Sequence, residues 1–425
     1  MKKLFSILLM ALLMSVSLGL PVTAQDGLII TDLGTLGGTR SYAYGINNLS
    51  QVVGYSDTIA GQTHAFLWEA GDMTDLGTLG GDVSVAHDIN DQGQVAGYSH
   101  ISSGQIHAFL WQDGTMTDLG TLGGSESSAY GINDLSQVVG YSQTASGMYH
   151  AFLWQDGVMM DLGTLGGTAS FAYDVNELGQ VAGYSYIDPR EYHAFLWEDG
   201  VMRDLGTLGG GLSVALDINN KSQVIGHSLP LPTSGAMDAF LWQDGVMTDL
   251  GTLGNDGSVA FGINEQSQVA GYSRTTIEQV LAFLWEDGTM TDLGTLGGSY
   301  SLAFGINDLG QVVGYIQTAS GEEHASLWTV SLPPASPEEQ IDGIIEHIAR
   351  LVETGVLNTG QGNALQSKLE NTLRQLDKVN PQAACNLLQA FTNQIQSLID
   401  GGILSSDEGQ SLIDEANAVE SQICP

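Results

Sequence analysis

The hexapeptide Asp-Leu-Gly-Thr-Leu-Gly at residues 75–80 recurs along the chain at a fixed period. Its copies begin at Asp32, Asp75, Asp118, Asp161, Asp204, Asp249 and Asp292. The spacing is 43 residues, except for 45 residues between the fifth and sixth copies. A period of this length is typical of repeat architectures, so the repeat is the first guide to the fold.

Each repeat is expected to contain four short strands separated by turns. In the copy that spans residues 83–122, the strands are predicted over 83–89, 94–98, 107–111 and 116–122. Asp113-Gly114 between the last two strands is a strong hairpin signal, because glycine accepts the positive φ of such turns. A four-stranded antiparallel unit of this length matches one blade of a β-propeller.

The two ends of the repeat array predict a closed ring. The array opens with a lone fourth strand at residues 28–36 and ends after a third strand at 324–330. If the first strand completes the last blade, two exposed sheet edges disappear. We therefore predict an all-β seven-bladed β-propeller over residues 25–332, with the N-terminal strand closing the last blade. An open β-array is the alternative.

The composition changes at Pro333-Pro334, where glycine becomes rarer and a helical period begins. A linker at residues 333–337 and a small all-α four-helix bundle at 338–425 are predicted. Ser336 and Glu339 fit a capping box at the start of the first helix, which is expected to end near Gly355. The other helices are expected at about 360–379, 380–401 and 405–423.

The chain has two cysteines, Cys385 and Cys424. Consecutive helices joined by short loops pack antiparallel, which places the start of the third helix near the end of the fourth. We therefore expect a disulfide between Cys385 and Cys424.

Residues 1–24 are expected to be a signal peptide. Lys2 and Lys3 precede an apolar run at residues 4–20, and Val22-Thr23-Ala24 fits a cleavage site. An uncleaved membrane anchor is the alternative, and no later stretch is apolar enough to span a membrane. The protein is therefore predicted to be secreted and extracellular, with the periplasm or the cell surface as other destinations.

The repeat units resemble the bacterial extracellular HAF repeats over residues 28–330. The motif stands here as His64-Ala65-Phe66, His107-Ala108-Phe109, His150-Ala151-Phe152 and His193-Ala194-Phe195. The resemblance implies an extracellular repeat protein without an established activity. The chain departs from the motif at Asp238, Leu281 and Ser326.

The C-terminal segment resembles the FIMAH domains of secreted bacterial and archaeal proteins over residues 338–423. The matching strings are Gly355-Val356-Leu357-Asn358, Leu388-Gln389-Ala390-Phe391 and Leu412-Ile413-Asp414 with Ala416. This resemblance implies a small helical accessory module for interaction or stability.

The chain is strongly acidic, with 48 Asp and Glu against 11 Lys and Arg and a formal net charge of −37. Such a surface repels phosphate backbones, so nucleic acid is excluded as a partner class. It also repels anionic lipid headgroups. The charge by itself identifies no ligand.

Four polar or aromatic residue types recur in register, and we interpret all of them as structural. The histidines are expected to bond a neighbouring blade or the backbone, because a ring holds equivalent residues too far apart to share an ion. Asparagine is expected to bond its own turn, glutamine to satisfy backbone groups between blades, and tryptophan to fill the core. The four series are His64, His107, His150, His193 and His324; Asn47, Asn90, Asn133, Asn176, Asn219, Asn264 and Asn307; Gln51, Gln94, Gln137, Gln180, Gln223, Gln268 and Gln311; and Trp68, Trp111, Trp154, Trp197, Trp242, Trp285 and Trp328.

The sequence contains no nucleophile elbow, phosphate loop or zinc-ligand spacing. No catalytic residue, metal ligand or cofactor is therefore predicted. Calcium is a weak candidate because Asp91, Asp134 and Asp308 lie in turns, although no calcium-loop pattern accompanies them.

A binding site is expected where the repeats differ rather than where they agree. The connectors between the second and third strands vary most, and they share one face with the connectors between units. The binding candidates on this face are Arg40, Tyr186, Asp188, Arg190, Glu191, Tyr192 and Arg274. Drift in unconstrained loops is the alternative explanation.

These observations favour a secreted, non-enzymatic binding protein that presents this face to an extracellular protein or a carbohydrate. A polysaccharide-acting enzyme is the second hypothesis, and it requires a carboxylate pair or a His–carboxylate pair that breaks the repeat. A calcium-stabilised structural surface protein is the third.

Overall fold

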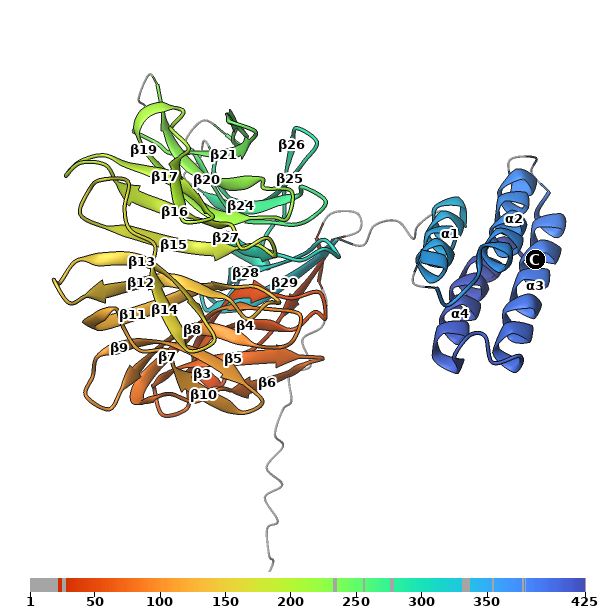
Figure 1. Cartoon of the computed structure of the whole chain (residues 1–425), viewed down its shortest axis with the longest axis horizontal. Coiled ribbons are helices and arrows are strands. Elements are labelled where there is room, and N and C mark those ends of the chain that lie inside the picture. The colour runs from red at the N-terminus through yellow and green to blue at the C-terminus, as the bar shows by residue number, and fades with distance from the viewer. Residues whose placement is uncertain are drawn as a thin grey trace, which may run out of the picture. The chain divides into compact units, whose positions relative to one another are not determined.

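The computed structural model describes residues 22–24, 28–231, 235–254, 257–275, 279–330, 337–353, 355–376, 378 and 380–424. The predicted signal peptide up to residue 21, the linker prolines Pro333 and Pro334, and the expected N-cap Ser336 lie outside these residues. The chain divides into two compact domains, Met1–Val330 and Ser331–Pro425. The first is built from strands and the second from helices (Figure 1).

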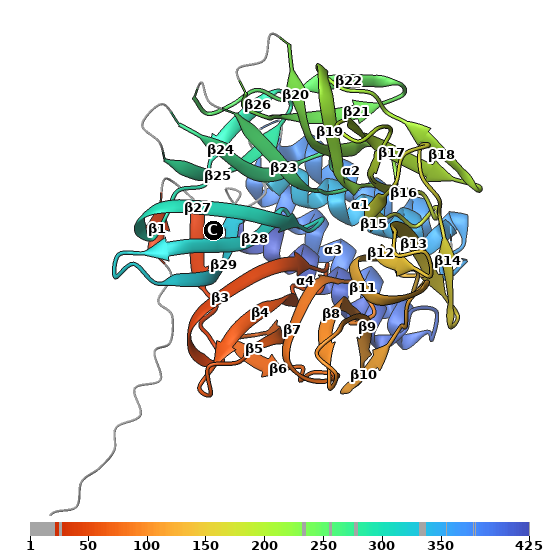
Figure 2. The same ribbon diagram turned by 90° about the vertical axis from the view of Figure 1, so that its left-hand side faces the viewer.

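Within the described part of residues 28–330, the strands form seven antiparallel four-stranded units around one axis (Figure 2). Units 1 to 3 consist of β3 (Gly37–Ile46), β4 (Val52–Thr58), β5 (Thr63–Glu69) and β6 (Asp72–Asp75); β7 (Gly80–Ile89), β8 (Val95–Ile101), β9 (Ile106–Gln112) and β10 (Thr115–Asp118); and β11 (Gly123–Ile132), β12 (Val138–Thr144), β13 (Tyr149–Gln155) and β14 (Val158–Asp161).

Units 4 to 7 follow the same order. They consist of β15 (Ser170–Val175), β16 (Val181–Tyr186), β17 (Tyr192–Glu198) and β18 (Val201–Asp204); β19 (Gly209–Ile218), β20 (Val224–Pro230), β21 (Asp238–Gln243) and β22 (Val246–Asp249); β23 (Ser258–Ile263), β24 (Val269–Arg274), β25 (Val280–Glu286) and β26 (Thr289–Asp292); and β27 (Gly297–Ile306), β28 (Gln311–Thr318), β29 (Glu323–Val330) and β2 (Leu28–Asp32).

Unit 7 takes its outer strand from the start of the chain. β2 pairs antiparallel with β29 over five residues, from Leu28 opposite Val330 to Asp32 opposite Ser326. A further short strand, β1 (Val22–Ala24), pairs with the outer edge of β2. The N-terminal strand therefore completes the last unit, as the ends of the array predicted.

The hydrophobic core lies in layers between neighbouring units. One layer joins Val53 and Ala65 of unit 1 to Ala86, Val95 and Phe109 of unit 2. An equivalent layer joins unit 7 to unit 1. Because each unit buries side chains on both faces, its strands carry nearly continuous small and apolar residues.

The outer strand of each unit is shorter than predicted. In unit 2 it ends at Asp118 rather than at residue 122. The Asp118 carboxylate accepts a hydrogen bond from the Gly120 amide at 2.8 Å, and Gly120 has φ +76°. The hexapeptide is thus mostly a turn and not a strand. The expected hairpin at Asp113-Gly114 is confirmed, with φ of +49° and +80°.

The helical domain contains α1 (Pro337–Glu353), α2 (Thr359–Leu376), α3 (Pro381–Asp400) and α4 (Ser406–Ile423) among its described residues. Asn380 caps α3 by accepting the Ala383 amide, and Pro381 occupies the first turn. The predicted disulfide between Cys385 and Cys424 is present, with Cα atoms 5.8 Å apart. No helix in the described residues is both long enough and apolar enough to cross a membrane.

Candidate functional site

The repeated asparagines join neighbouring units in a ring of hydrogen bonds. Oδ1 of Asn133 accepts from the amides of Leu135 and Gln137, so the expectation that asparagine bonds its own turn is confirmed. Nδ2 of Asn133 also donates to the carbonyl oxygen of Asn176 in the next unit at 2.9 Å. The same bond recurs between neighbouring units and returns from Asn307 to Asn47 at 3.0 Å. The ring is therefore closed on this face.

The residue after each asparagine forms a second ring. The Asp91 amide donates to the Asp134 carboxylate at 2.9 Å, and the Asp308 amide donates to the Asn48 side chain at 2.9 Å. The turn aspartates considered as calcium ligands thus accept amides from neighbouring units. In the described ranges, no group of three or more His, Cys, Asp or Glu side chains is placed to hold a metal ion.

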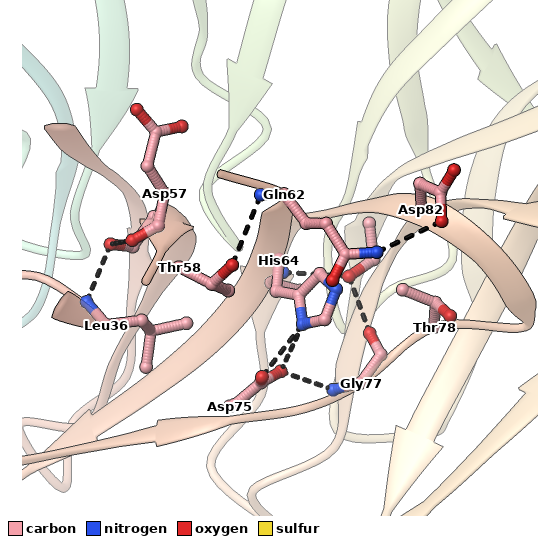
Figure 3. A network of polar contacts seen from close by, with 12 residues as sticks. Leu36, Asp57, Thr58, Gln62, His64, Asp75, Gly77, Thr78 and Asp82 are labelled. Atoms are coloured by element: carbon pink, nitrogen blue, oxygen red, sulfur yellow. Dashed lines mark hydrogen bonds and ion pairs between the residues drawn. The ribbon is translucent and has the colours of Figure 1, made fainter. Parts of the chain in front are cut away.

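Each repeated histidine bonds the first aspartate of the hexapeptide. Nδ1 of His64 lies 2.8 Å from the Asp75 carboxylate, which also accepts the Gly77 amide (Figure 3). The same pair occurs in four other units, where the described histidines are His107, His150, His193 and His324. The expected partner was wrong, because each of these histidines bonds a side chain of the same unit rather than the backbone or another blade.

The repeated glutamines were expected to bond backbone groups between blades, and this prediction was wrong. Nε2 of Gln94 donates to the Gln112 side chain of the same unit, and Oε1 accepts from Asn90 and from Ser136 of the next unit. The glutamines therefore bond side chains rather than backbone groups. The tryptophans pack on the inter-unit cores as expected, with Trp242 and Trp328 buried and the others half-buried.

The binding candidates lie in three separate places around the ring. Arg40 of unit 1 pairs with Asp57 at 3.0 Å. Tyr186 and Tyr192 of unit 4 face each other, with ring centroids 5.6 Å apart. The structure therefore does not assemble the candidates into one site.

The loop between Tyr186 and Tyr192 is exposed. The Asp188 carboxylate accepts hydrogen bonds from the amides of Arg190 and Glu191 at 2.7 and 2.9 Å, and these bonds stabilise the turn. This pattern is typical of aspartate at the start of a tight turn.

Arg274 of unit 6 is the candidate that lines a cavity. It is exposed at the end of β24, and it borders two inter-unit cavities on the connector face. The smaller, of about 290 Å³, lies between units 5 and 6. The larger, of about 600 Å³, lies between units 6 and 7 and is called here the unit 6–7 cavity. Its lining residues are Tyr272, Arg274, Gln279, Val280, Ser299, Tyr300, Leu302 and Tyr315.

Sequence reasoning missed the tyrosines of this cavity. Tyr272 and Tyr315 belong to a repeated series on the second strand of each unit, with His227 in unit 5. The other members are Tyr55, Tyr98, Tyr141 and Tyr184. The recurring Gly-Tyr-Ser string was the available signal, but regularity alone did not distinguish these residues from core positions.

A carboxylate links two aromatic residues beside the unit 6–7 cavity. The hydroxyls of Tyr42 and Tyr300 both donate to Glu323. Burial acts to raise the pKa of Glu323, but these two hydrogen bonds outweigh it and lower the pKa. Burial and the bond to Glu323 raise the pKa of Tyr300. Tyr300 is therefore held in one orientation as a neutral hydroxyl.

A third cavity, of about 260 Å³, lies on the axis and is called here the channel cavity. An inner series of first-strand residues lines it, with ring centroids between 4.4 and 5.2 Å apart from Phe261 round to Tyr173. The members of this series are Tyr44, His87, Tyr130, Tyr173, Leu216, Phe261 and Phe304.

Three aspartates reach the channel cavity where the other units have glycine. They are Asp88, Asp174 and Asp217, against Gly45, Gly131, Gly262 and Gly305. A Cβ on Gly131 would lie 2.8 Å from the Asp174 Cα, so the crowded axis favours glycine next to an aspartate. Burial and the charge of Asp174 raise the pKa of Asp88 to about 7, and the same two causes, together with a hydrogen bond to the Asp174 carboxyl, raise the pKa of Asp217.

The helical segment at residues 341–421 matches the FIMAH domain family. No family model for HAF repeats matches the chain, so the resemblance of the repeat region to them stays a prediction. None of the curated proteins compared with the chain matches its sequence.

Several solved structures share a distant likeness with the chain. TolB from Acinetobacter baumannii is 10% identical, with a TM-score of 0.41, over 57% of this chain and 63% of that one. A Mycobacterium tuberculosis puromycin-hydrolyzing peptidase is 14% identical, with a TM-score of 0.47, over 65% of this chain and 49% of that one. The SapL1 lectin, in complex with alpha methyl fucoside, is 15% identical, with a TM-score of 0.33, over 70% of this chain and 97% of that one. The chain thus spans less than two thirds of the TolB and peptidase chains.

Proposed function

We propose that this protein is a secreted, non-enzymatic binding protein that holds a carbohydrate in the unit 6–7 cavity. The observation that carries the proposal is the lining of that cavity, which combines three tyrosines with Arg274, Gln279 and Ser299. A sugar ring has C–H faces that pack on aromatic rings and hydroxyl edges that bond polar side chains. A volume of about 600 Å³ is in the range of small-molecule sites.

The position of Arg274 supports this proposal. Residues 28–330 contain only five basic side chains, and this one borders both inter-unit cavities. A concave cavity with convergent polar groups suits a glycan better than a flat protein partner, which is the other class that the sequence allowed.

Secretion is the second part of the proposal. The disulfide between Cys385 and Cys424 requires an oxidising compartment for its formation. Cleavage after Ala24 would remove β1 and leave β2 as the outer edge of unit 7. The FIMAH domain would then serve as a second module of the exported protein.

A glycan array and isothermal titration with the chain from residue 25 onward test the binding. We expect at least one glycan to bind, and Arg274→Ala or Tyr272→Ala to weaken its affinity by about tenfold or more. Arg203→Ala is the matched control, because Arg203 is an exposed arginine on the outer strand of unit 4. Absence of any glycan ligand, or an equal loss in the Arg203 variant, would refute the proposal.

A further inference from the structure

The channel cavity has the chemistry of a cation site, and we propose that it binds a small organic ammonium ion. Aromatic side chains from five units form its wall, and Asp88, Asp174 and Asp217 reach into it. It shares no residue with the unit 6–7 cavity, so this inference is independent of the carbohydrate proposal.

The carboxyl groups retain acceptor capacity toward the cavity. Asp88 accepts the amides of Ile89 and Ile132 at 2.8 and 2.9 Å. Asp217 accepts those of Ile218 and Ile263, each at 2.7 Å. Each carboxylate oxygen has two lone pairs, so one amide bond leaves another acceptor position. The described lining residues include no lysine or arginine to balance these charges.

His87 supplies a second and independent indication of a ligand. Its Nε2 atom is buried and has no hydrogen-bond partner. The ring stacks on Tyr130, with centroids 4.4 Å apart, and five of the other six units carry tyrosine or phenylalanine at this position next to the cavity. Burial lowers the pKa of His87 to about 4, so the ring is neutral and its nitrogen can accept an N–H donor.

The geometry favours an ammonium ion over a metal ion. A metal needs several ligands at short range, and no such group exists in the described part of the chain. An ammonium ion instead gains from aromatic faces within about 6 Å and donates its N–H groups to separate acceptors. A primary ammonium fits better than a quaternary one, because the carboxyl and imidazole acceptors need hydrogen-bond donors.

Binding is expected to strengthen as pH rises through about 7, because Asp88 must ionise to pair with the cation. The titratable groups that face Asp88 and Asp217 are Asp174, His87, Tyr44, Tyr130 and Tyr173, with Glu177 near Asp174. The tyrosines and His87 stay neutral over this range, so the carboxyl groups dominate the change. Binding of the cation therefore releases protons.

Isothermal titration of the secreted chain with butylammonium tests the site. We expect saturable binding that is absent with butanol, weaker with tetramethylammonium and stronger at about pH 8 than at about pH 6. Titration in two buffers of different ionisation enthalpy measures the released protons. Glucosamine and Nα-acetyl-lysine amide, as further arms, distinguish an amino sugar from a protein side chain as the natural source of the ammonium group.

Two variants locate the binding. Asp174→Asn keeps the shape and a carbonyl acceptor but removes the charge, and it should lower affinity by about tenfold or more. His87→Tyr restores the residue of neighbouring units and should also weaken binding. Asp72→Asn, on the exposed outer edge of unit 1, is the control and should bind as the unmodified chain does. No binding of butylammonium, or equal binding by all variants, would overturn the proposal.

Discussion

At the residue scale, one asparagine per unit connects the turn to the ring. Asn133 uses its carbonyl oxygen within its own turn and its amide group on the next unit. A side chain with only one of these functions could not do both, which explains why neither aspartate nor serine replaces asparagine in any of the units.

Asn133→Ala is expected to lower the free energy of unfolding by about 3 kcal/mol, because it leaves buried backbone groups without partners. Urea titration followed by tryptophan fluorescence measures this change. Leu135→Ala in the same turn is the control, since Leu135 is 55% exposed and should change stability by less than about 0.5 kcal/mol. Similar losses in the two variants would contradict the role given to Asn133.

The residue types predicted local contacts better than contacts between units. The preference of asparagine for turns can be recognised in a single sequence. The bond from Asn133 to Asn176, in contrast, depends on a neighbour 43 residues away. The sequence also did not identify Asp75 as the partner of His64 or Gln112 as the partner of Gln94, because these side chains meet only when the strands of one unit pair. The chemistry of a side chain restricts which groups it can bond, and the fold determines which of these groups lies within reach.

At the scale of elements, β2 is the strand that closes the ring. It pairs with β29, and the pair is reinforced by His324, whose Nδ1 lies 2.7 Å from the Asp32 carboxylate. The bond to Asp32 raises the pKa of His324, despite an opposite effect of burial. Burial acts to raise the pKa of Asp32, but the bonds from His324 and Gly34 lower it.

The β2–β29 contact should therefore weaken as the pH becomes alkaline. The raised pKa of His324 contributes stability below its unfolded value of about 6.5, and this contribution is lost as pH rises through the folded value. The lowered pKa of Asp32 contributes above about 3.9, so the pair is strongest between these limits. His324→Leu should cost on the order of 1 kcal/mol at about pH 5.5 and less at about pH 8.5.

Thermal unfolding of both chains across this pH range measures the difference. Leucine is a fair replacement, because Leu281 stands at the same position in unit 6. A stability difference that does not depend on pH would show that the ion pair contributes nothing to closure.

The order and number of elements could be predicted from the repeat, but their ends could not. The outer strands end at the hexapeptide aspartate because its carboxylate bonds a glycine amide two residues later. The helices lie within a few residues of their predicted ranges, since proline and asparagine mark the start of α3 and the apolar period marks its length.

At the scale of the whole molecule, the net charge does not indicate where a site lies, because the acidic excess is spread over the chain. The prediction of a site on the connector face rested instead on the positions where the repeats differ. That reasoning found Arg274 but not Tyr272, Tyr300 or Tyr315, because two of these tyrosines repeat. It also missed Asp88, Asp174 and Asp217, since the sequence alone does not show that their position faces the channel cavity.

A net charge of −37 predicts that salt stabilises the molecule. Raising sodium chloride from about 10 mM to about 500 mM shortens the Debye length from about 30 Å to a few ångström and screens the repulsion. We expect the midpoint of thermal unfolding to rise by roughly 2–4 °C. Calcium chloride at matched ionic strength is the control, and a much larger rise with calcium would instead support the calcium-stabilised alternative.

Ring closure also sets the order in which the molecule can fold. His324 and Asp32, which meet at the closing strands, are 292 residues apart in the chain. Neighbouring units can form early because their contacts are separated by one period, whereas β2 finds β29 only after the entire array has emerged. Until then β2 has no partner strand and presents an unpaired edge to any similar chain. In an exported protein this incomplete state would exist outside the membrane, so protection from aggregation depends on how soon the last repeat follows the first.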